Sequence, residues 1–117
     1  MREHPFTTTH GCLDALILNA SEWLSAYCCS KAALRQLVVS LAGELSPEIR
    51  CNSVAPGIVL APESSTVTED IGSLVARVPL RRSATGHEIA NAVEFLLQNQ
   101  YVTGHTLVVD GGLSTAA

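Results

Sequence analysis

AYCCSKAALRQLVVSLAGELSPEIRCNSVAPG, residues 26–57, is the stretch that decides the fold of this chain. From residue 26 to residue 45 the apolar side chains recur at helical spacing, which predicts an amphipathic helix with one stripe facing a core. The stripe consists of Leu34, Leu37, Val38, Leu41 and Leu45. Pro47 ends this helix. Residues 50–54 then predict a strand, which Ala55-Pro56-Gly57 breaks.

Two further strands are predicted on either side of this stretch. The run LDALIL, residues 13–18, is short and mostly apolar, which favours a buried strand over a helix. Residues 106–109 predict a last strand, and Asp110-Gly111-Gly112 closes it. We expect residues 1–12 to be a flexible leader and residues 13–117 to form one domain.

Residues 58–85 form a long connection that contains two prolines and many Ser and Thr residues. We expect one short helix in it, around residues 71–78. A connection of this length is uncommon in a compact domain unless it serves a function. Thr85 and Glu88 then have the spacing of a capping box. The helix that follows places four apolar residues on one face: Ile89, Ala92, Val93 and Leu96.

The predicted order of strand, helix, strand, connection, helix and strand indicates an α/β fold with a parallel sheet and flanking helices. The chain has 117 residues and a formal net charge of -4, and its 7 Lys and Arg residues form no basic stripe, so nucleic-acid binding is excluded. No apolar run approaches the ~20 residues that cross a bilayer. We therefore expect no membrane partner and a cytoplasmic location.

The cysteines and histidines predict no metal site. The chain has 4 Cys and 4 His, and neither set has the spacing of metal ligands. Reduced thiols used as small apolar residues are typical of a cytosolic protein.

The residues that carry chemistry are Tyr27 and Lys31, four positions apart at the start of the first predicted helix. Positions i and i+4 share one face of a helix, so the phenol and the ammonium can reach one site. A phenol titrates near ~10 and is a poor proton donor at neutral pH. A nearby ammonium favours the phenolate and lowers that pKa, which suits the phenol to general acid catalysis.

Four motifs occur in order along the chain: Leu18-Asn19-Ala20-Ser21, the Tyr27 and Lys31 pair, Asn52-Ser53-Val54-Ala55-Pro56-Gly57, and the stretch from Val102 to Gly112. On these motifs the chain resembles the short-chain dehydrogenase/reductase family from Leu13 to Ser114. The resemblance implies the C-terminal part of a Rossmann-like, doubly wound parallel sheet that lacks its N-terminal strands.

The resemblance also implies roles for single residues. Tyr27 is the implied proton donor, and Lys31 the residue that binds the nicotinamide ribose. Further cofactor contacts fall on the turn after the second predicted strand and on the end of the first: Pro56, Gly57, Ile58, Asn19 and Ala20. The implied cofactor is NADP or NAD, and the implied partner is a small-molecule substrate.

The substrate class stays open between two alternatives. Asn19-Ala20-Ser21-Glu22-Trp23 and Arg77-Val78-Pro79-Leu80 are similar to segments of pteridine and dihydromonapterin reductases, which we favour. The alternative is a carbonyl reductase of the 3-oxoacyl or sugar-alcohol type.

The sequence departs from the family in two ways. It has no G-x-x-x-G-x-G turn, whose backbone N–H groups bind pyrophosphate at a helix N-terminus. Only residues 22–26 separate Ser21 from Tyr27, so the segment that carries the family's catalytic serine has no counterpart. A three-stranded sheet built this way exposes an edge and favours a homo-oligomer. A second hypothesis is therefore a truncated, inactive family remnant that only self-associates.

Overall fold

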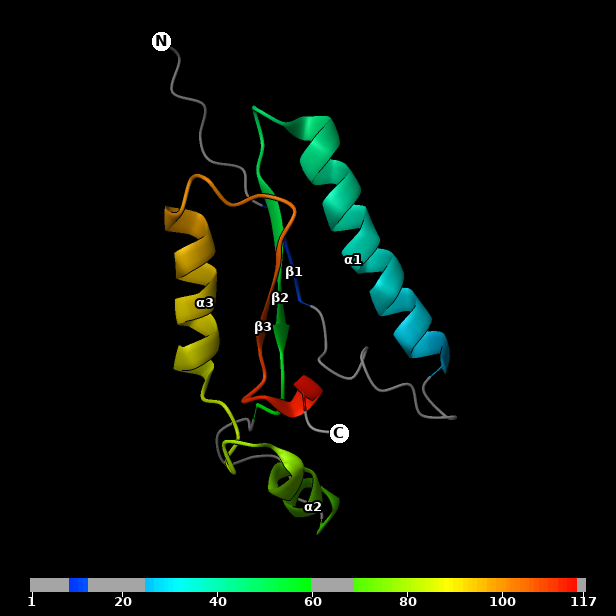
Figure 1. Cartoon of the computed structure of the whole chain (residues 1–117), viewed down its shortest axis with the longest axis vertical. Helices are drawn as coiled ribbons and strands as arrows, with labels where there is room; N and C mark the ends of the chain where they lie inside the picture. The colour runs from blue at the N-terminus through cyan, green and yellow to red at the C-terminus, as the bar shows by residue number, and fades with distance from the viewer. Residues whose placement is uncertain (1–8, 13–24, 60–68, 116–117) are drawn as a thin grey trace.

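The computed structural model describes residues 9–12, 25–59 and 69–115. In chain order the elements are β1 (Thr9–Cys12), α1 (Ser25–Leu45), β2 (Cys51–Pro56), α2 (Glu69–Arg77), α3 (Gly86–Gln98), β3 (Thr106–Val109) and the short 3-10 helix η2 (Leu113–Thr115). Figure 1 shows the strands at the centre, with a long helix on either side of them and α2 beyond one end.

The sheet is parallel, with the strand order β1-β2-β3. In the register, Cys12 lies opposite Val54, and Pro56 lies opposite Val109. Every residue of β2 is buried, because helices cover both of its faces. We call the end of the sheet where β2 begins the amino edge, and the end where β2 and β3 finish the carboxyl edge.

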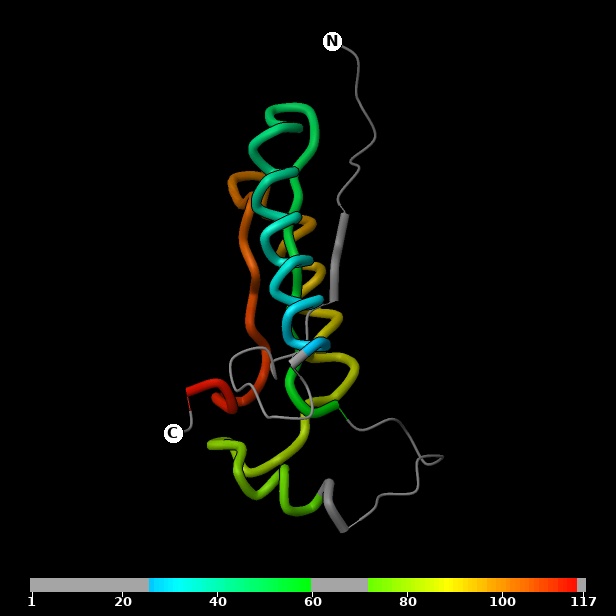
Figure 2. Tube along the Cα trace, turned by 90° about the vertical axis from the view of Figure 1, so that its right-hand side faces the viewer, coloured from blue at the N-terminus to red at the C-terminus, as the bar shows by residue number. Residues whose placement is uncertain are grey.

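The two long helices lie on opposite faces of the sheet (Figures 1 and 2). Between α1 and β2, the core consists of Val38, Ala42 and Cys51, with Leu41, Leu45 and Ile49 packed against it. Between α3 and the sheet, the core consists of Val54, Ala92 and Leu96, supported by Ile89, Val93, Val102, Leu107 and Val109. Alternate residues of β2 thus serve two separate apolar layers.

At the amino edge, polar side chains tie the connection after α3 to β2. The buried Asn52 donates to the Val102 carbonyl at 2.9 Å and accepts from the His105 N–H at 3.0 Å. The Arg50 guanidinium donates to the carbonyls of Leu96, Leu97 and Val102 at 2.9 to 3.0 Å. Two of these carbonyls belong to the last turn of α3, which has no helical partners for them.

Most predicted elements are confirmed, with small shifts of their ends. The helix predicted over residues 26–45 is α1, the strand predicted over residues 50–54 is β2, and the short helix predicted around residues 71–78 is α2. The capping box is present at the start of α3, where Thr85 and Glu88 bond each other's backbone N–H groups. The parallel sheet with flanking helices is also confirmed.

One prediction needs correction at the N-terminal end. We expected residues 1–12 to be a flexible leader, but Thr9–Cys12 forms β1 and pairs with Cys51–Val54. The physical reason is that the edge of β2 offers hydrogen bonds to any extended segment, whatever its hydropathy. The strand predicted over residues 13–18 lies outside the described residues.

Candidate functional site

Four parts of the chain come together at the carboxyl edge of the sheet. These are the start of α1, the ends of β2 and β3, and the segment from α2 to the start of α3 (Figure 1). Ligands of open parallel α/β sheets bind beyond the carboxyl ends of the strands. The site is therefore built from residues at this edge.

Tyr27 and Lys31 lie on the same face of α1, as their spacing predicts. The Lys31 Nζ is 5.2 Å from the centroid of the Tyr27 ring, within the range of a cation–π contact. Both side chains are half-buried. The first two turns of α1 therefore hold a phenol and a positive charge together, while their catalytic role stays a prediction.

Gly57 joins the ends of β2 and β3. Its N–H donates to the Val109 carbonyl at 2.9 Å. A Cβ at this position would lie 2.7 Å from the Asp110 Cα, which is too close for any side chain. The next residue, Ile58, accepts at its carbonyl from the Ala84 N–H at 2.8 Å. The predicted cofactor turn, Pro56 to Ile58, is thus held by backbone contacts on both sides.

Asp110 supports this turn from β3. Its carboxylate accepts from the Gly112 N–H at 2.9 Å and from the Ser114 N–H at 2.7 Å. Burial raises the pKa of this carboxyl, but the hydrogen bonds from Ser114 and Gly112 outweigh burial and hold the pKa below its ordinary value. Asp110 is therefore a buried anion that shapes the chain reversal after β3.

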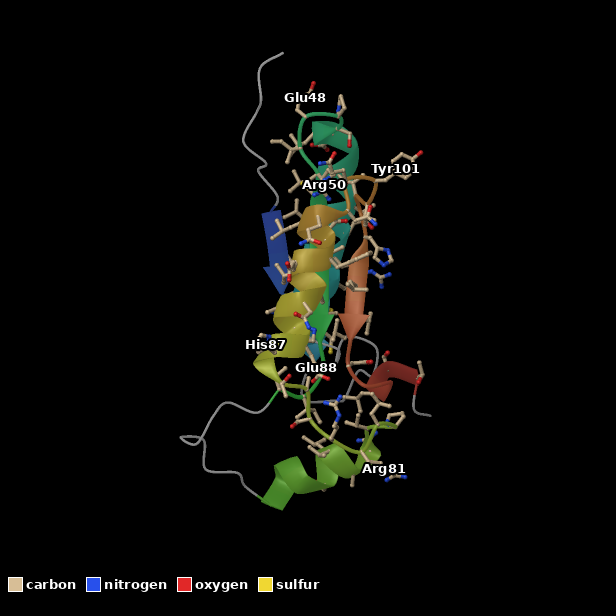
Figure 3. All side chains as sticks on the ribbon, turned by 90° about the vertical axis from the view of Figure 1, so that its left-hand side faces the viewer. Glu48, Arg50, Arg81, His87, Glu88 and Tyr101 are labelled. Carbon is tan, nitrogen blue, oxygen red and sulfur yellow. The ribbon has the colours of Figure 1, made fainter. Side chains whose placement is uncertain are left out.

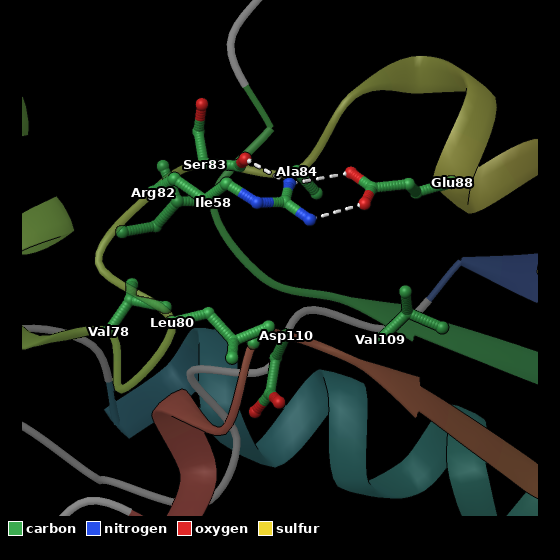
Figure 4. Close-up of a pocket in the computed structure, with 10 residues that line it drawn as sticks. Ile58, Val78, Leu80, Arg82, Ser83, Ala84, Glu88, Val109 and Asp110 are labelled. Atoms are coloured by element: carbon green, nitrogen blue, oxygen red, sulfur yellow. Dashed lines mark hydrogen bonds and ion pairs between the residues drawn. The ribbon is translucent and has the colours of Figure 1, made fainter.

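A small open pocket of about 90 Å³ lies at this edge. Its lining comes from the cofactor turn, the connection before α3 and the end of β3: Ile58, Val78, Leu80, Arg82, Ser83, Ala84, Glu88, Val109, Asp110 and Gly111. In Figure 4 the Asp110 carboxylate points away from the Arg82 guanidinium. Ligand pockets usually exceed ~300 Å³, so this cavity has room only for water or for part of a ligand. Among the predicted site residues, only Ile58 lines it.

Arg82 and Glu88 form a bidentate ion pair across the mouth of this pocket (Figure 4). The two nitrogen-to-oxygen distances are 2.9 and 2.6 Å. The Arg82 guanidinium and the Thr85 N–H lower the pKa of Glu88 from 4.5 to about 2. The same Glu88 carboxylate completes the capping box, so the connection before α3 is anchored to that helix.

The sequence reasoning missed some of these residues. Asp110 was predicted only as part of a chain reversal, because no local pattern shows that its carboxylate is buried. Arg82 was not singled out, although it lies three positions before Thr85, the first residue of the capping box. Asn19 and Ala20, predicted on the adenosine side, lie outside the described residues.

The described part of the chain contains neither a metal-binding cluster nor a membrane-spanning helix. No group of three His, Cys, Asp or Glu side chains there is placed to hold a metal ion. Among the described helices, none combines the length and apolar character that spanning a bilayer requires.

A parallel sheet covered by helices on both faces, with a candidate site at the carboxyl edge, defines a Rossmann-like α/β domain. Comparison with known proteins narrows this class. The family profile described as enoyl-(acyl carrier protein) reductase matches residues 13–114. The chain therefore belongs to the short-chain dehydrogenase/reductase family.

Individual relatives agree with this assignment. Carbonyl reductase family member 4 of Xenopus laevis is 46% identical over 90 residues, which cover 76% of this chain and 37% of the relative. The human 3-oxoacyl-[acyl-carrier-protein] reductase is 41% identical over 97 residues, which cover 82% of this chain and 40% of the relative.

A solved structure matches the whole chain. FolM alternative dihydrofolate reductase 1 from Brucella canis, complexed with NADP, has a TM-score of 0.85 and 28% identity. The match covers 100% of this chain and 46% of that structure. The chain thus spans less than half the length of the relatives it matches.

Proposed function

We propose that this chain carries the proton-donating part of an NAD(P)H-dependent reductase. The observation that carries the proposal is the shared face of Tyr27 and Lys31, with 5.2 Å between the Nζ and the ring centroid. Family membership supports it, because the matched residues 13–114 include this pair.

In the proposed reaction, the Tyr27 Oη donates a proton to the oxygen or nitrogen of the substrate that gains negative charge. The Lys31 ammonium stabilises the anion left on the phenol, since an opposite charge at this range favours the charged form. A bound nicotinamide supplies the hydride. With the cofactor bound, the Lys31 Nζ would donate hydrogen bonds to the ribose hydroxyls, and the backbone at Pro56, Gly57 and Ile58 would contact the nicotinamide.

The residues present fit one end of the cofactor. A phenol, an ammonium and a glycine-containing turn at the carboxyl edge suit a nicotinamide riboside. The chain contains no glycine-rich phosphate turn, so we assign the pyrophosphate contacts to no residue of it. NADP is the cofactor we propose, because the similar Brucella structures are NADP complexes.

For the substrate we propose a pterin ring. Support comes from the match to FolM alternative dihydrofolate reductase 1 over 100% of this chain. A carbonyl substrate is the second candidate, because carbonyl and 3-oxoacyl reductases are 41 to 46% identical to this chain.

The test is a comparison of the two tyrosines of the chain. We expect NADPH to quench the fluorescence of Trp23, the single tryptophan, in a saturable way, and dihydropterin or carbonyl substrates to be reduced slowly. Tyr27→Phe should abolish turnover and leave quenching unchanged, because it removes only the Oη. Tyr101→Phe is the matched control, since Tyr101 is fully exposed at the amino edge.

Two outcomes would contradict the proposal. Turnover that survives Tyr27→Phe would show that Tyr27 is not the proton donor. Absence of both quenching and turnover in the folded chain, with association measured by sedimentation, would favour the inactive remnant that only self-associates.

A further inference from the structure

Positive charge is concentrated in one short segment at the carboxyl edge. Three of the chain's 7 Lys and Arg residues, Arg77, Arg81 and Arg82, fall within six positions, although the net charge is -4. Arg77 is in the last turn of α2, and the other two lie in the connection to α3. This segment is therefore locally basic in a chain that is acidic as a whole.

Arg82 is already neutralised by an ion pair. Both terminal nitrogens of the Arg82 guanidinium donate to the Glu88 carboxylate. Among the side chains that the structure describes, no carboxylate pairs with Arg77 or Arg81. Both are exposed. We call Arg77 and Arg81 the α2 arginine pair.

The backbone at Arg81 is strained. Its φ is +57°, in the left-handed region that glycine adopts easily and other residues avoid. The Arg81 N–H closes a turn onto the Val78 carbonyl at 2.8 Å, and the guanidinium donates to the Ala76 carbonyl. A glycine would form the turn without strain, so an arginine at this position lowers the stability of the fold.

The pair is anchored to the proposed site through the backbone. The Leu80 N–H donates to the Gly111 carbonyl at 3.2 Å, and the Ala84 N–H donates to the Ile58 carbonyl. The buried Val78 fixes the end of α2 against Gly111. Figure 3 shows the Arg81 side chain pointing away from the sheet, at the same end as Glu88.

We propose that the α2 arginine pair binds the anionic tail of the substrate, a phosphate monoester or a pair of carboxylates. The proposal rests on the proposed reductase function and adds a substrate feature to it. Guanidinium groups bind both kinds of anion through paired hydrogen bonds. The tail would bind outside the small pocket, while the reacting part of the substrate faces Tyr27.

The experiment uses isolated tails, which need neither cofactor nor hydride transfer. Isothermal titration of the whole chain with p-aminobenzoyl-glutamate tests a dicarboxylate tail, and titration with 4′-phosphopantetheine tests a phosphate tail. We expect one of them to bind, with affinity that falls as salt is added. Arg81→Gln should weaken this binding about ten-fold, the value of one charge-assisted contact. Arg35→Gln, which removes an exposed arginine of α1, should change it less than two-fold.

A second variant separates binding from folding. Arg81→Gly removes the guanidinium and relieves the strained φ, so we expect weaker tail binding together with a Tm raised by about 4 °C. The proposal would be overturned if Arg81→Gln and Arg35→Gln lowered the affinity for the tail equally, or if tail binding survived Arg81→Gly. Binding of adenosine 2′,5′-bisphosphate alone would also overturn it, because the pair would then serve the cofactor.

The reductase proposal fails in a different way. Tail binding should persist in Tyr27→Phe, because the phenol takes no part in it. Tail binding without any turnover would therefore contradict the proposed chemistry and still support anion binding by the α2 arginine pair.

Discussion

The two edges of the sheet use polar side chains in opposite ways. At the amino edge, the Arg50 and Asn52 side chains form hydrogen bonds with backbone groups of the chain itself. At the carboxyl edge, beside a turn held by Gly57, the half-buried Lys31 lies over the Tyr27 ring, and the exposed Arg81 donates to one backbone carbonyl, that of Ala76. The contrast teaches that the amino edge maintains the fold, whereas positive charge stays near the surface at the carboxyl edge, where we propose that a ligand binds.

Asn52→Ala should have the largest effect on stability, about 3 kcal/mol. Asn52 is 0% exposed, and its loss leaves the His105 N–H unpaired and a cavity beside β2. Urea unfolding followed by circular dichroism measures the change. Asn91→Ala, on the exposed side of α3, should leave the free energy of unfolding within ~0.5 kcal/mol. Similar values for both variants would mean that the amino edge is not what holds the fold.

Gly57→Ala should destabilise by about 2 kcal/mol, because the added Cβ meets backbone and not a movable side chain. It should also weaken any NADPH binding, since the turn must shift away from Asp110. Gly43→Ala provides the opposite case. Nothing lies within 4 Å of the Cβ that the substitution adds in the last turn of α1, so the substitution should stabilise by ~0.5 kcal/mol. If both substitutions raised the free energy of unfolding, or both lowered it, this account would be contradicted.

Arg50→Met should cost about 1.5 kcal/mol through the carbonyls of Leu96, Leu97 and Val102 that lose their donor. Methionine keeps the apolar stem of the side chain, so the loss reports the hydrogen bonds. Thermal unfolding at neutral pH measures it. An equal loss from Arg35→Met, where no such carbonyls are bound, would show that charge alone matters.

Glu88→Gln should have the smallest effect, and one that depends on pH. The folded pKa of Glu88 is about 2, below its ordinary value of 4.5, so the carboxylate stabilises the fold above pH 4.5. This contribution is lost as the pH falls from 4.5 towards 2. The difference in Tm between the parent chain and Glu88→Gln should therefore shrink over that range. Glu44→Gln, on the exposed side of α1, should show no such trend.

Local patterns allowed much of the fold to be predicted. The stripe of α1 and the capping box of α3 are short-range features, set by residues three or four positions apart. β1 was missed because its hydrogen bonds come from β2, some 40 residues further along the chain. Polar Thr9 and His10 carry no sign of that partner.

The site was predictable only where its residues share an element. Tyr27 and Lys31 lie on one helix, so their spacing alone placed them together. The burial of Asp110 and the pairing of Arg82 depend on how separate segments pack. The left-handed conformation of Arg81 had no sequence signal at all, because glycine or asparagine would have been expected there.

The position of β2 has a consequence for how the molecule unfolds. Since this strand supplies Cys51 to one apolar cluster and Val54 to the other, neither helix can leave the sheet without exposing residues that the opposite layer needs. Unfolding of either layer should therefore unfold the other in a single cooperative transition. The backbone amides of β2 should then exchange with deuterium more slowly than those at the exposed ends of α1 and α2, at a rate set by global opening.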